Sequence, residues 1–501
     1  MSLLQNTMAK SGTVPFYNGV VETSVRLAGD SYLTLDNAGS ATSTQKCTLS
    51  CWFKRTELTV LSNIFHSAND SGGASFGISL DAADTISVTQ YSGASPFDAA
   101  AYDFGVTVAP RKFRDTSAWY HLVVTIDTTL GSGTTNEADR IKIYINGTRQ
   151  TVVASNDGSG SQDFADEDQT VASFQDGKQT WGATVTGSQI AHIYLAECNG
   201  VDGLALDASY FGETKNGVWI PIAPNVSEYG NHGFRLQFTS TAHDAPASLG
   251  SADTDNIGAD SSGKNNHFTA VDAIGTHDCA MPDSPENNFN TFSPLIPFNS
   301  GTLTEGNLKS NNVLGGSNVG PMSAFGVTTG KWFCEMYIHD IGGGDYVYAG
   351  AFLKRIDSST RFGIDLAVPY DGSVYFEGAA QGSSLEVSAN GHIYGFAVDC
   401  DNFTAQVYKT VGGTYGTYGP EIDWSGSAHK NSGYMGIGHF GASGTSGRDG
   451  GITVNYGQDP SFAGAITAGT ETPSEGAGVF KLAPPSGFLA LCTANLPEPT
   501  I

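Results

Sequence analysis

Residues 139–150 read DRIKIYINGTRQ, and this stretch decides the expected fold class. Apolar and polar side chains alternate in it, which is the period of a β-strand with one buried face. Three isoleucines form the face that we expect to be buried: Ile141, Ile143 and Ile145. The side chains between them are expected to face outward: Arg140, Lys142 and Tyr144. The pair Asn146-Gly147 follows, and it favours the tight type I′ turn of a β-hairpin.

The same alternation recurs along both halves of the chain. In the first half it predicts strands at 24–35, 46–55, 119–127, 189–198 and 233–240. In the second half it predicts strands at 331–340, 346–353, 361–366, 373–377, 392–399, 403–409 and 451–457. No segment keeps a helical period beyond about two turns. Short strands separated by Gly, Asn and Asp turns predict antiparallel β-sandwiches.

Composition divides the chain into four parts. Residues 1–23 lack a clear period and are expected to form an N-terminal arm, whereas 24–240 hold the first set of strands. Residues 241–299 are polar and contain five prolines, so we expect an irregular linker that wraps its neighbours. Residues 300–501 hold the second set of strands. The expected fold is therefore all-β, with two antiparallel β-sandwiches in tandem after the arm.

The charge balance argues against nucleic acid as a partner. The chain has 24 Lys and Arg against 50 Asp and Glu, a formal net charge of −26. This excess repels phosphate backbones, and no run of basic residues offsets it. No apolar stretch approaches about 18 residues, so no membrane insertion is expected. The first residues show no basic segment leading into an apolar run, so no secretory signal is expected.

Strings in both halves resemble known β-sandwich families. Those in the first half resemble a laminin-G/concanavalin-A-like jelly roll, and they are Tyr32–Leu35, Cys51–Arg55, Trp119–His121 and Ile143–Gly147. Three more resemble the version of this domain found in marine bacteriophages: Phe211–Thr214, Gly217–Trp219 and Asp260–Phe268. Strings of the second half resemble a SPRY-like domain, itself a concanavalin-A-like sandwich: Thr329–Glu335, Gly395–Asp401 and Gln406–Lys409. The strings Pro484–Phe488 and Asn495–Pro497 also resemble the phage proteins.

The resemblance implies a non-enzymatic structural protein on the exterior of a phage virion, made in the cytoplasm of the host bacterium. The leading expectation is a fibre or tail-associated adhesin that attaches to host-surface glycans. One alternative is a capsid decoration or head-fibre protein that stabilises or covers the shell. Another, from a different class, is a polysaccharide-cleaving enzyme. The implied partners are other virion proteins and further copies of this chain, as a trimer by analogy with phage appendages.

The enzyme alternative rests on one string, Glu421–Ser425 (EIDWS). It begins like the signature of concanavalin-like glucanases, which place an acid and a nucleophile about 5–5.5 Å apart on one strand face. The second glutamate of that signature is missing, because Ser425 or Gly426 stands in its place. We therefore expect no catalytic residue, and an acidic strand end anchored by Trp424.

The motifs require no cofactor. The resemblance to lectin-like folds makes calcium the metal to consider. Laminin-G-like and lectin-like folds often hold calcium at the rim of the sandwich. The candidate ligands lie in one acidic loop: Asp157, Asp163, Asp166 and Asp168. Calcium needs six to eight oxygens, and this loop lacks ordered EF-hand spacing. The alternative is a solvated acidic surface. His121, in a predicted core strand, is expected to be a hydrogen-bonded core residue and not a ligand.

Glycan binding calls for an exposed aromatic ring beside polar groups of a rim loop, so that the ring covers the C–H face of a sugar. We expect such loops at 90–104 and 412–419. Their candidate residues are Tyr91, Phe97, Tyr102, Tyr415 and Tyr418. The alternative is that these rings pack against their own sheet or a neighbouring subunit.

The N-terminal arm is the candidate for anchoring the chain on another protein. Its large apolar side chains are Leu3, Leu4, Val14, Phe16 and Tyr17. Burying each of them is worth roughly 1.5–3 kcal/mol, so they are costly to leave in water. The alternative is ordinary packing of the arm onto the first sandwich.

Overall fold

The hairpin at 139–150 forms as expected in the computed structural model. Strand β9 (Ile141–Ile145) buries its three isoleucines and leads through a tight turn into β10 (Thr148–Arg149). Asn146 and Gly147 have φ of 48° and 76°, the left-handed values that a type I′ turn requires. Arg140 does not face outward as expected. It is 3% exposed, because its guanidinium donates to the carbonyls of Leu130 and Ala165.

The described residues form two units, which divide between Glu286 and Asn287. The structure describes residues 16–69, 73–92, 102–131, 137–154, 164–239, 256–272, 280–295, 302–311, 321–341, 347–352, 366–368, 372–377, 379–382, 386–427, 436–441 and 450–496.

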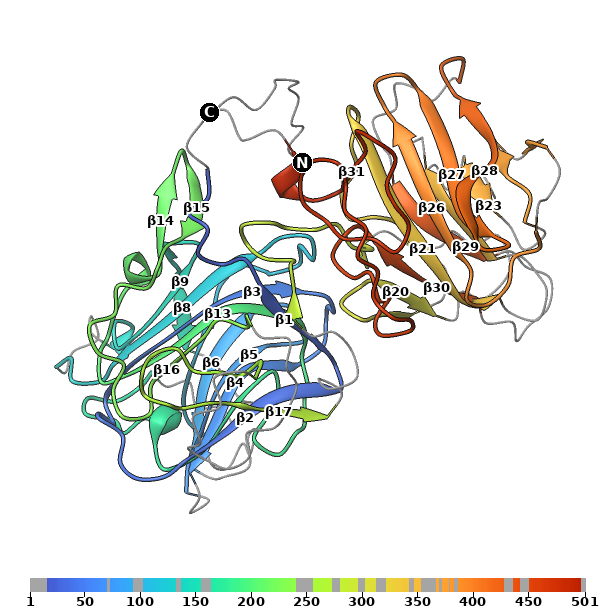
Figure 1. Cartoon of the computed structure of the whole chain (residues 1–501). Helices are drawn as coiled ribbons and strands as arrows, with labels where there is room; N and C mark the ends of the chain where they lie inside the picture. The colour runs from blue at the N-terminus through green and yellow to red at the C-terminus, as the bar shows by residue number, and fades with distance from the viewer. Residues whose placement is uncertain are drawn as a thin grey trace. The chain divides into compact units, whose positions relative to one another are not determined.

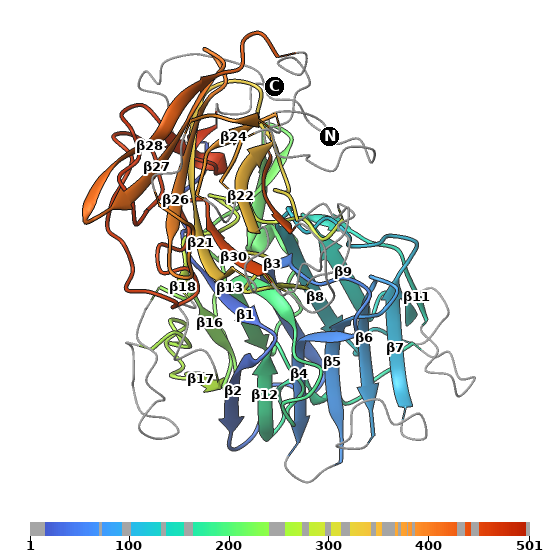
Figure 2. The same cartoon turned by 90° about the vertical axis from the view of Figure 1, so that its right-hand side faces the viewer.

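The first unit is a sandwich of two antiparallel sheets (Figure 1). Sheet A runs in the order β10, β9, β8 (Tyr120–Asp127), β3 (Lys46–Arg55), β13 (His192–Asp202), β1 (Ser24–Ala28) and β18 (Ala280–Met281), and β16 (Phe234–Leu236) also pairs with β13. Sheet B runs in the order β11 (Val152–Ala154), β7 (Tyr102–Val108), β6 (Ile86–Tyr91), β5 (Ser75–Leu80), β4 (Ser62–Asn69), β12 (Gly177–Trp181), β2 (Ser31–Asn37) and β17 (Thr269–Asp272). Figure 2 shows the strands of sheet B from β2 to β7 side by side.

Apolar side chains of both sheets meet between them in one core, in which Phe53, Phe76 and Trp181 are among the largest buried residues. The outer face of sheet A is covered as well. Val123 of β8 packs there against Leu206 and Phe211, in a segment that includes the hairpin β14 (Gly212–Lys215) and β15 (Val218–Pro221). This second layer explains why β8 is apolar on both faces.

Strands β4 to β7 lie outside the set expected from the sequence. The alternation of Phe76, Ile78 and Leu80 predicts β5 as clearly as the isoleucines predict β9, so the signal is present. The segment 241–299 is also more regular than an irregular linker. Its strands β17 and β18 pair with β2 and β1 and complete both sheets of the first sandwich.

The second unit also contains two sheets. The larger runs in the order β19 (Thr302–Thr304), β20 (Lys309–Asn311), β30 (Gly450–Asn455), β21 (Lys331–Ile341), β26 (Ile393–Asp399), β27 (Thr404–Val411) and β28 (Thr414–Asp423), and β31 (Leu489–Ala490) pairs parallel with β21. The smaller runs in the order β25 (Ala379–Ala380), β24 (Tyr375–Phe376), β23 (Leu366–Val368), β22 (Val347–Phe352) and β29 (Gly436–Gly441). The fold class is therefore all-β, as expected.

Short 3-10 turns in the described part of the chain are η2 (Ala172–Phe174), η3 (Ala208–Tyr210) and η5 (Thr493–Asn495). None of the helices described is long and apolar enough to cross a membrane.

Candidate functional site

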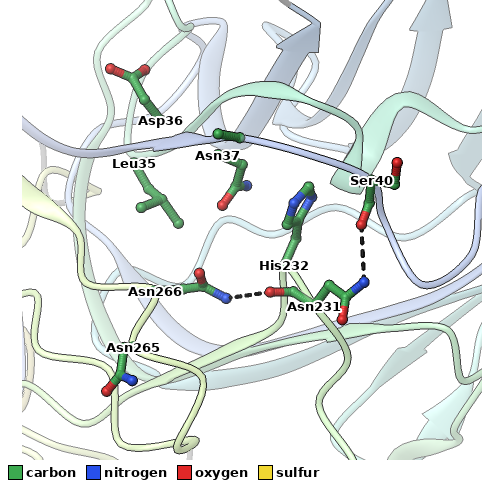
Figure 3. A pocket seen from close by; sticks show the side chains of 9 residues that line it. Leu35, Asp36, Asn37, Ser40, Asn231, His232, Asn265 and Asn266 are labelled. Atoms are coloured by element: carbon green, nitrogen blue, oxygen red, sulfur yellow. Dashed lines mark hydrogen bonds between the residues drawn. The ribbon is translucent and has the colours of Figure 1, made fainter. Parts of the chain in front are cut away.

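A polar pocket lies at one end of the first sandwich, where three segments distant in sequence meet (Figure 3). Its volume is about 400 Å³. The first segment is the end of β2 and the residues after it, the second is the turn before β16, and the third is the loop before β17. The lining residues are Leu35, Asp36, Asn37, Ala38, Ser40, Asn231, His232, Asn265 and Asn266.

Asp260 holds the third segment in place. Its Oδ1 accepts the backbone N–H groups of Arg235 and Ser262, both at 2.8 Å. Its Oδ2 accepts the Ser262 hydroxyl at 2.8 Å and the Asn266 backbone N–H at 2.9 Å. Asp260 is 8% exposed, so these bonds are made largely away from water. The loop that carries Asn265 and Asn266 is therefore fixed without a ligand.

Asparagine side chains join the three segments to one another. Asn266 Nδ2 donates to the backbone carbonyls of Asn231 at 3.0 Å and Gly233 at 2.7 Å. Asn231 Nδ2 donates in turn to the Ser40 carbonyl at 3.1 Å (Figure 3). Gly233 leaves no space for a side chain, because a Cβ there would lie 1.8 Å from the carbonyl oxygen of Tyr229. One side of the pocket is thus a continuous hydrogen-bonded wall.

Asp202 of β13 supports this wall from the interior. It is 1% exposed and accepts three backbone N–H groups, those of Thr42 at 2.7 Å, Ser43 at 3.1 Å and His232 at 3.2 Å. Because one carboxylate binds both the loop after β2 and the turn before β16, the spacing of these two segments is set by the sandwich itself.

Two buried residues of the pocket keep hydrogen-bonding capacity. Asn37 is 6% exposed, and its Nδ2 has no partner among the described residues. Its amide points into the pocket between Leu35 and His232 (Figure 3). His232 is 4% exposed, with Nδ1 2.6 Å from the Phe174 carbonyl. Since a carbonyl only accepts, Nδ1 carries the proton, and Nε2 of the neutral ring is an acceptor.

The described lining of the pocket is amide-rich and includes no Lys or Arg side chain. Asp36 is half exposed, with its Oδ1 3.8 Å from Nζ of Lys178 on the neighbouring strand β12. Lys264, next to the lining residue Asn265, pairs with Glu228. Paired donors and acceptors on short side chains suit a ligand rich in hydroxyl groups. The sequence analysis missed these residues, and the one signal for them is the polar, turn-forming string Asp260–Phe268.

The structure places the first group of predicted aromatic residues in strands. Tyr91 ends β6 and Tyr102 begins β7, so the expected loop is shorter than 90–104. Tyr91 is 5% exposed and packs edge-on against Tyr102, with ring centroids 5.6 Å apart. Tyr91 therefore offers no exposed ring, and Tyr102 is half-buried. Phe97 lies outside the described residues.

The second group lies in β28, and not in a loop from 412 to 419. Tyr418 is 1% exposed and its hydroxyl donates to the Gly372 carbonyl at 2.6 Å, so it is a core residue and not an exposed platform. Tyr415 is 37% exposed, but its ring stacks on Tyr408 at 5.9 Å and its hydroxyl donates to the Ala483 carbonyl. For these two residues, packing against their own sheet is the arrangement observed.

Two of the candidate calcium ligands, Asp157 and Asp163, lie outside the described residues. Asp166 and Asp168 are exposed, and Asp168 Oδ1 accepts Gln45 Nε2 at 3.0 Å. The described residues hold no group of three or more carboxylate, imidazole or thiol side chains placed to bind a metal ion.

Of the arm residues proposed for anchoring, Leu3, Leu4 and Val14 lie outside the described residues. Phe16 is 6% exposed, and Lys215 Nζ lies 5.6 Å above its ring and donates to its carbonyl at 2.6 Å. Tyr17 packs edge-on against Phe16. Phe16 is therefore packed on the first unit itself.

His121 is the hydrogen-bonded core residue that the sequence predicts. Its Nδ1 accepts Trp219 Nε1–H at 3.0 Å, its Nε2 lies 3.0 Å from the Ser50 hydroxyl, and its ring stacks on Trp52. Because an indole only donates, Nδ1 is unprotonated, and Nε2 carries the proton. Burial lowers the pKa of His121 to about 3, so the ring stays neutral at ordinary pH.

The carboxylates of the glucanase-like string are exposed on β28, while Ile422 and Trp424 point inward. Hydrogen bonds from Ser425 lower the pKa of Asp423. A general acid of a glycosidase requires a carboxyl group with a raised pKa, so this lowered pKa does not favour an acid role for Asp423.

Comparison with known proteins finds one family model that matches part of the first unit and several similar solved structures. Residues 27–194 match the family model of the concanavalin A-like lectin/glucanases superfamily. No curated protein sequence matches the chain. Similar solved structures include domains LG4-5 of the mouse laminin alpha1 chain, with 10% identity over 90% of this chain and 92% of that one and a TM-score of 0.27. They also include the SPRY domain of human HERC1, with 14% identity over 32% of this chain and 96% of that one and a TM-score of 0.24. A third is domain 4 of the arabinanase AbnA from Geobacillus stearothermophilus, in complex with arabinotriose, with 20% identity over 39% and 79% and a TM-score of 0.23.

Proposed function

We propose that the first sandwich is a non-enzymatic carbohydrate-binding domain and that its site is the pocket around Asn37. The observation that carries the proposal is the amide of Asn37, a lining residue of the pocket, whose buried Nδ2 has no partner among the described residues. Buried donors are nearly always paired, because an unpaired one costs about 1–3 kcal/mol. A ligand oxygen would satisfy this donor. The lectin-type family match over the same domain supports the proposal.

We propose further that the chain is a structural protein on the exterior of a phage virion, where it acts as a fibre or tail-associated adhesin. The support is the resemblance of several strings to marine phage proteins. One of them, Asp260–Phe268, is also the loop that builds the pocket. The proposed partners are host-surface glycans, other virion proteins and two further copies of the chain. Capsid decoration remains the second candidate, and it requires hundreds of copies per particle where a fibre requires tens.

Binding of the full chain to an array of bacterial surface glycans tests the proposed function. We expect at least one glycan to bind, its binding to survive chelation of divalent cations, and no reducing sugar to be released. Absence of binding to any glycan or host cell would overturn the proposal. Release of reducing sugar that the substitution Glu421→Gln abolishes would instead establish the enzyme alternative.

A further inference from the structure

We infer that this pocket selects an uncharged sugar unit and excludes acidic ones such as uronic and sialic acids. The inference rests on the proposed carbohydrate-binding function and adds the class of ligand. Its basis is the charge and the donor–acceptor pattern of the lining, which differ from those of a site for anions.

The described residues of the pocket offer no unpaired positive charge to an acidic sugar. The lining contains no Lys or Arg, and the two lysines next to it are already paired, Lys178 with Asp36 and Lys264 with Glu228. A carboxylate in the pocket would therefore give up hydration without gaining a cation. The like charge of Asp36, a lining residue whose carboxylate is directed away from the other side chains of the pocket in Figure 3, adds repulsion over a longer distance.

The polar groups at the buried end of the pocket are complementary to a hydroxyl group. Asn37 Nδ2 is a donor without a partner in the described part of the chain, and with Nδ1 donating to Phe174, Nε2 of His232 is an acceptor in the neutral form of the ring. A hydroxyl can accept from the first and donate to the second. An ammonium group cannot accept, so the amine of a cationic amino sugar would leave Asn37 unpaired. A neutral polyol is the chemistry that satisfies both groups.

The hydrogen-bonded wall of the pocket also favours an uncharged sugar. Asn266 Nδ2 donates twice and Asn231 Nδ2 donates once in fixing the loops, and both residues also carry a side-chain carbonyl oxygen that can accept. Acceptors favour the O–H groups of a sugar and disfavour its carboxylate. The wall thus adds to the discrimination made by Asp36.

The test uses the full chain and matched pairs of neutral and acidic monosaccharides, for example glucose with glucuronate, titrated by calorimetry at low ionic strength. We expect a preference for the neutral member of about tenfold or more. In Asp36→Asn this preference should fall at least about threefold, because the repelling charge is gone. Asp30→Asn is the matched control, since Asp30 is an exposed carboxylate at the other end of β2, and its preference should equal that of the unaltered chain.

The outcomes separate this inference from the proposed function. Equal or tighter binding of the acidic sugar, or a preference that Asp36→Asn leaves unchanged, would overturn the inference while the domain remains a carbohydrate-binding one. Failure of every sugar to bind would overturn the proposed function itself, and the inference with it.

Discussion

The substitution Asn37→Leu should make the first sandwich more stable while it weakens ligand binding. Asn37 is 6% exposed, and its Nδ2 is buried without a partner among the described residues. Leucine has a similar volume and no polar atom, so it removes the desolvation penalty of that donor. We expect a gain of about 1–2 kcal/mol in the free energy of unfolding. For a domain of this size each kcal/mol corresponds to roughly 2–4 °C, so Tm should rise by about 2–8 °C.

The same change removes the donor that we assign to the ligand. Loss of one buried hydrogen bond corresponds to affinity reduced about five- to thirtyfold. Stability is measured by thermal and denaturant unfolding of the full chain, and affinity by calorimetry with a glycan that binds the unaltered chain. A gain of stability together with a loss of binding is typical of a residue retained for function.

Asn199→Leu is the matched control, because Asn199 is an equally buried asparagine of the same sandwich whose amide is fully engaged. It donates to the Glu197 carbonyl at 3.1 Å and accepts the Tyr229 hydroxyl at 2.9 Å. This variant should lose about 1–3 kcal/mol. If Asn37→Leu destabilises the domain as much as Asn199→Leu does, then Asn37 is satisfied in the free protein and our reasoning is wrong. If it stabilises the domain and leaves binding unchanged, the site lies elsewhere.

Three further predictions concern other parts of the chain. Asp260→Ala removes four hydrogen bonds from the pocket loop, so it should lower the free energy of unfolding by about 3–5 kcal/mol and abolish binding. Asp260→Asn keeps one acceptor and should cost less, and equal losses of stability in the two variants, measured by urea unfolding, would contradict the assigned bonds. Glu335→Gln should destabilise the second unit by about 1–3 kcal/mol, because Glu335 accepts hydrogen bonds from Asn455 Nδ2 and the backbone N–H groups of Lys481 and Leu482, and the NH2 group of glutamine would oppose one of these donors. Unchanged amide hydrogen exchange at residues 481–482 would contradict this prediction. Acidification from pH 7 to pH 5 should lower the stability of the first unit by about 2 kcal/mol for each of His66 and His121, because burial lowers the pKa of these rings to about 4 and about 3, and in this pH range only the unfolded rings, with a pKa near 6.5, take up protons. Imidazole NMR signals of these residues that titrate near pH 6.5 would refute the prediction.

Local pattern predicts the strands of this protein well where one face is buried. The isoleucines of β9 and the Asn146-Gly147 turn follow from residues within a few positions of one another, because the period of side-chain burial in a strand is a local property. The same period is present in β5, where Phe76, Ile78 and Leu80 alternate with smaller residues. The all-β class needs no more than this.

The burial of Arg140 and Tyr418, which the sequence predicts to be exposed, depends on residues distant in the chain. Arg140 is buried because the carbonyls of Leu130 and Ala165 surround its guanidinium, and Tyr418 is buried because its hydroxyl reaches Gly372. In both cases the partner comes from another part of the chain. An alternation pattern cannot show such partners, so it assigns a polar or aromatic residue to the surface by default.

The sequence by itself determined the all-β class, the hairpin at β9 and the place of His121 in a core strand. Only the tertiary structure decided the pocket, because Asn37, His232 and Asn266 lie far apart in the chain and meet through the pairing of β2 with β17 and β13 with β16. Strand formation depends on neighbouring residues, whereas the meeting of three loops depends on sheet order and on long-range bonds such as those of Asp202 and Asp260.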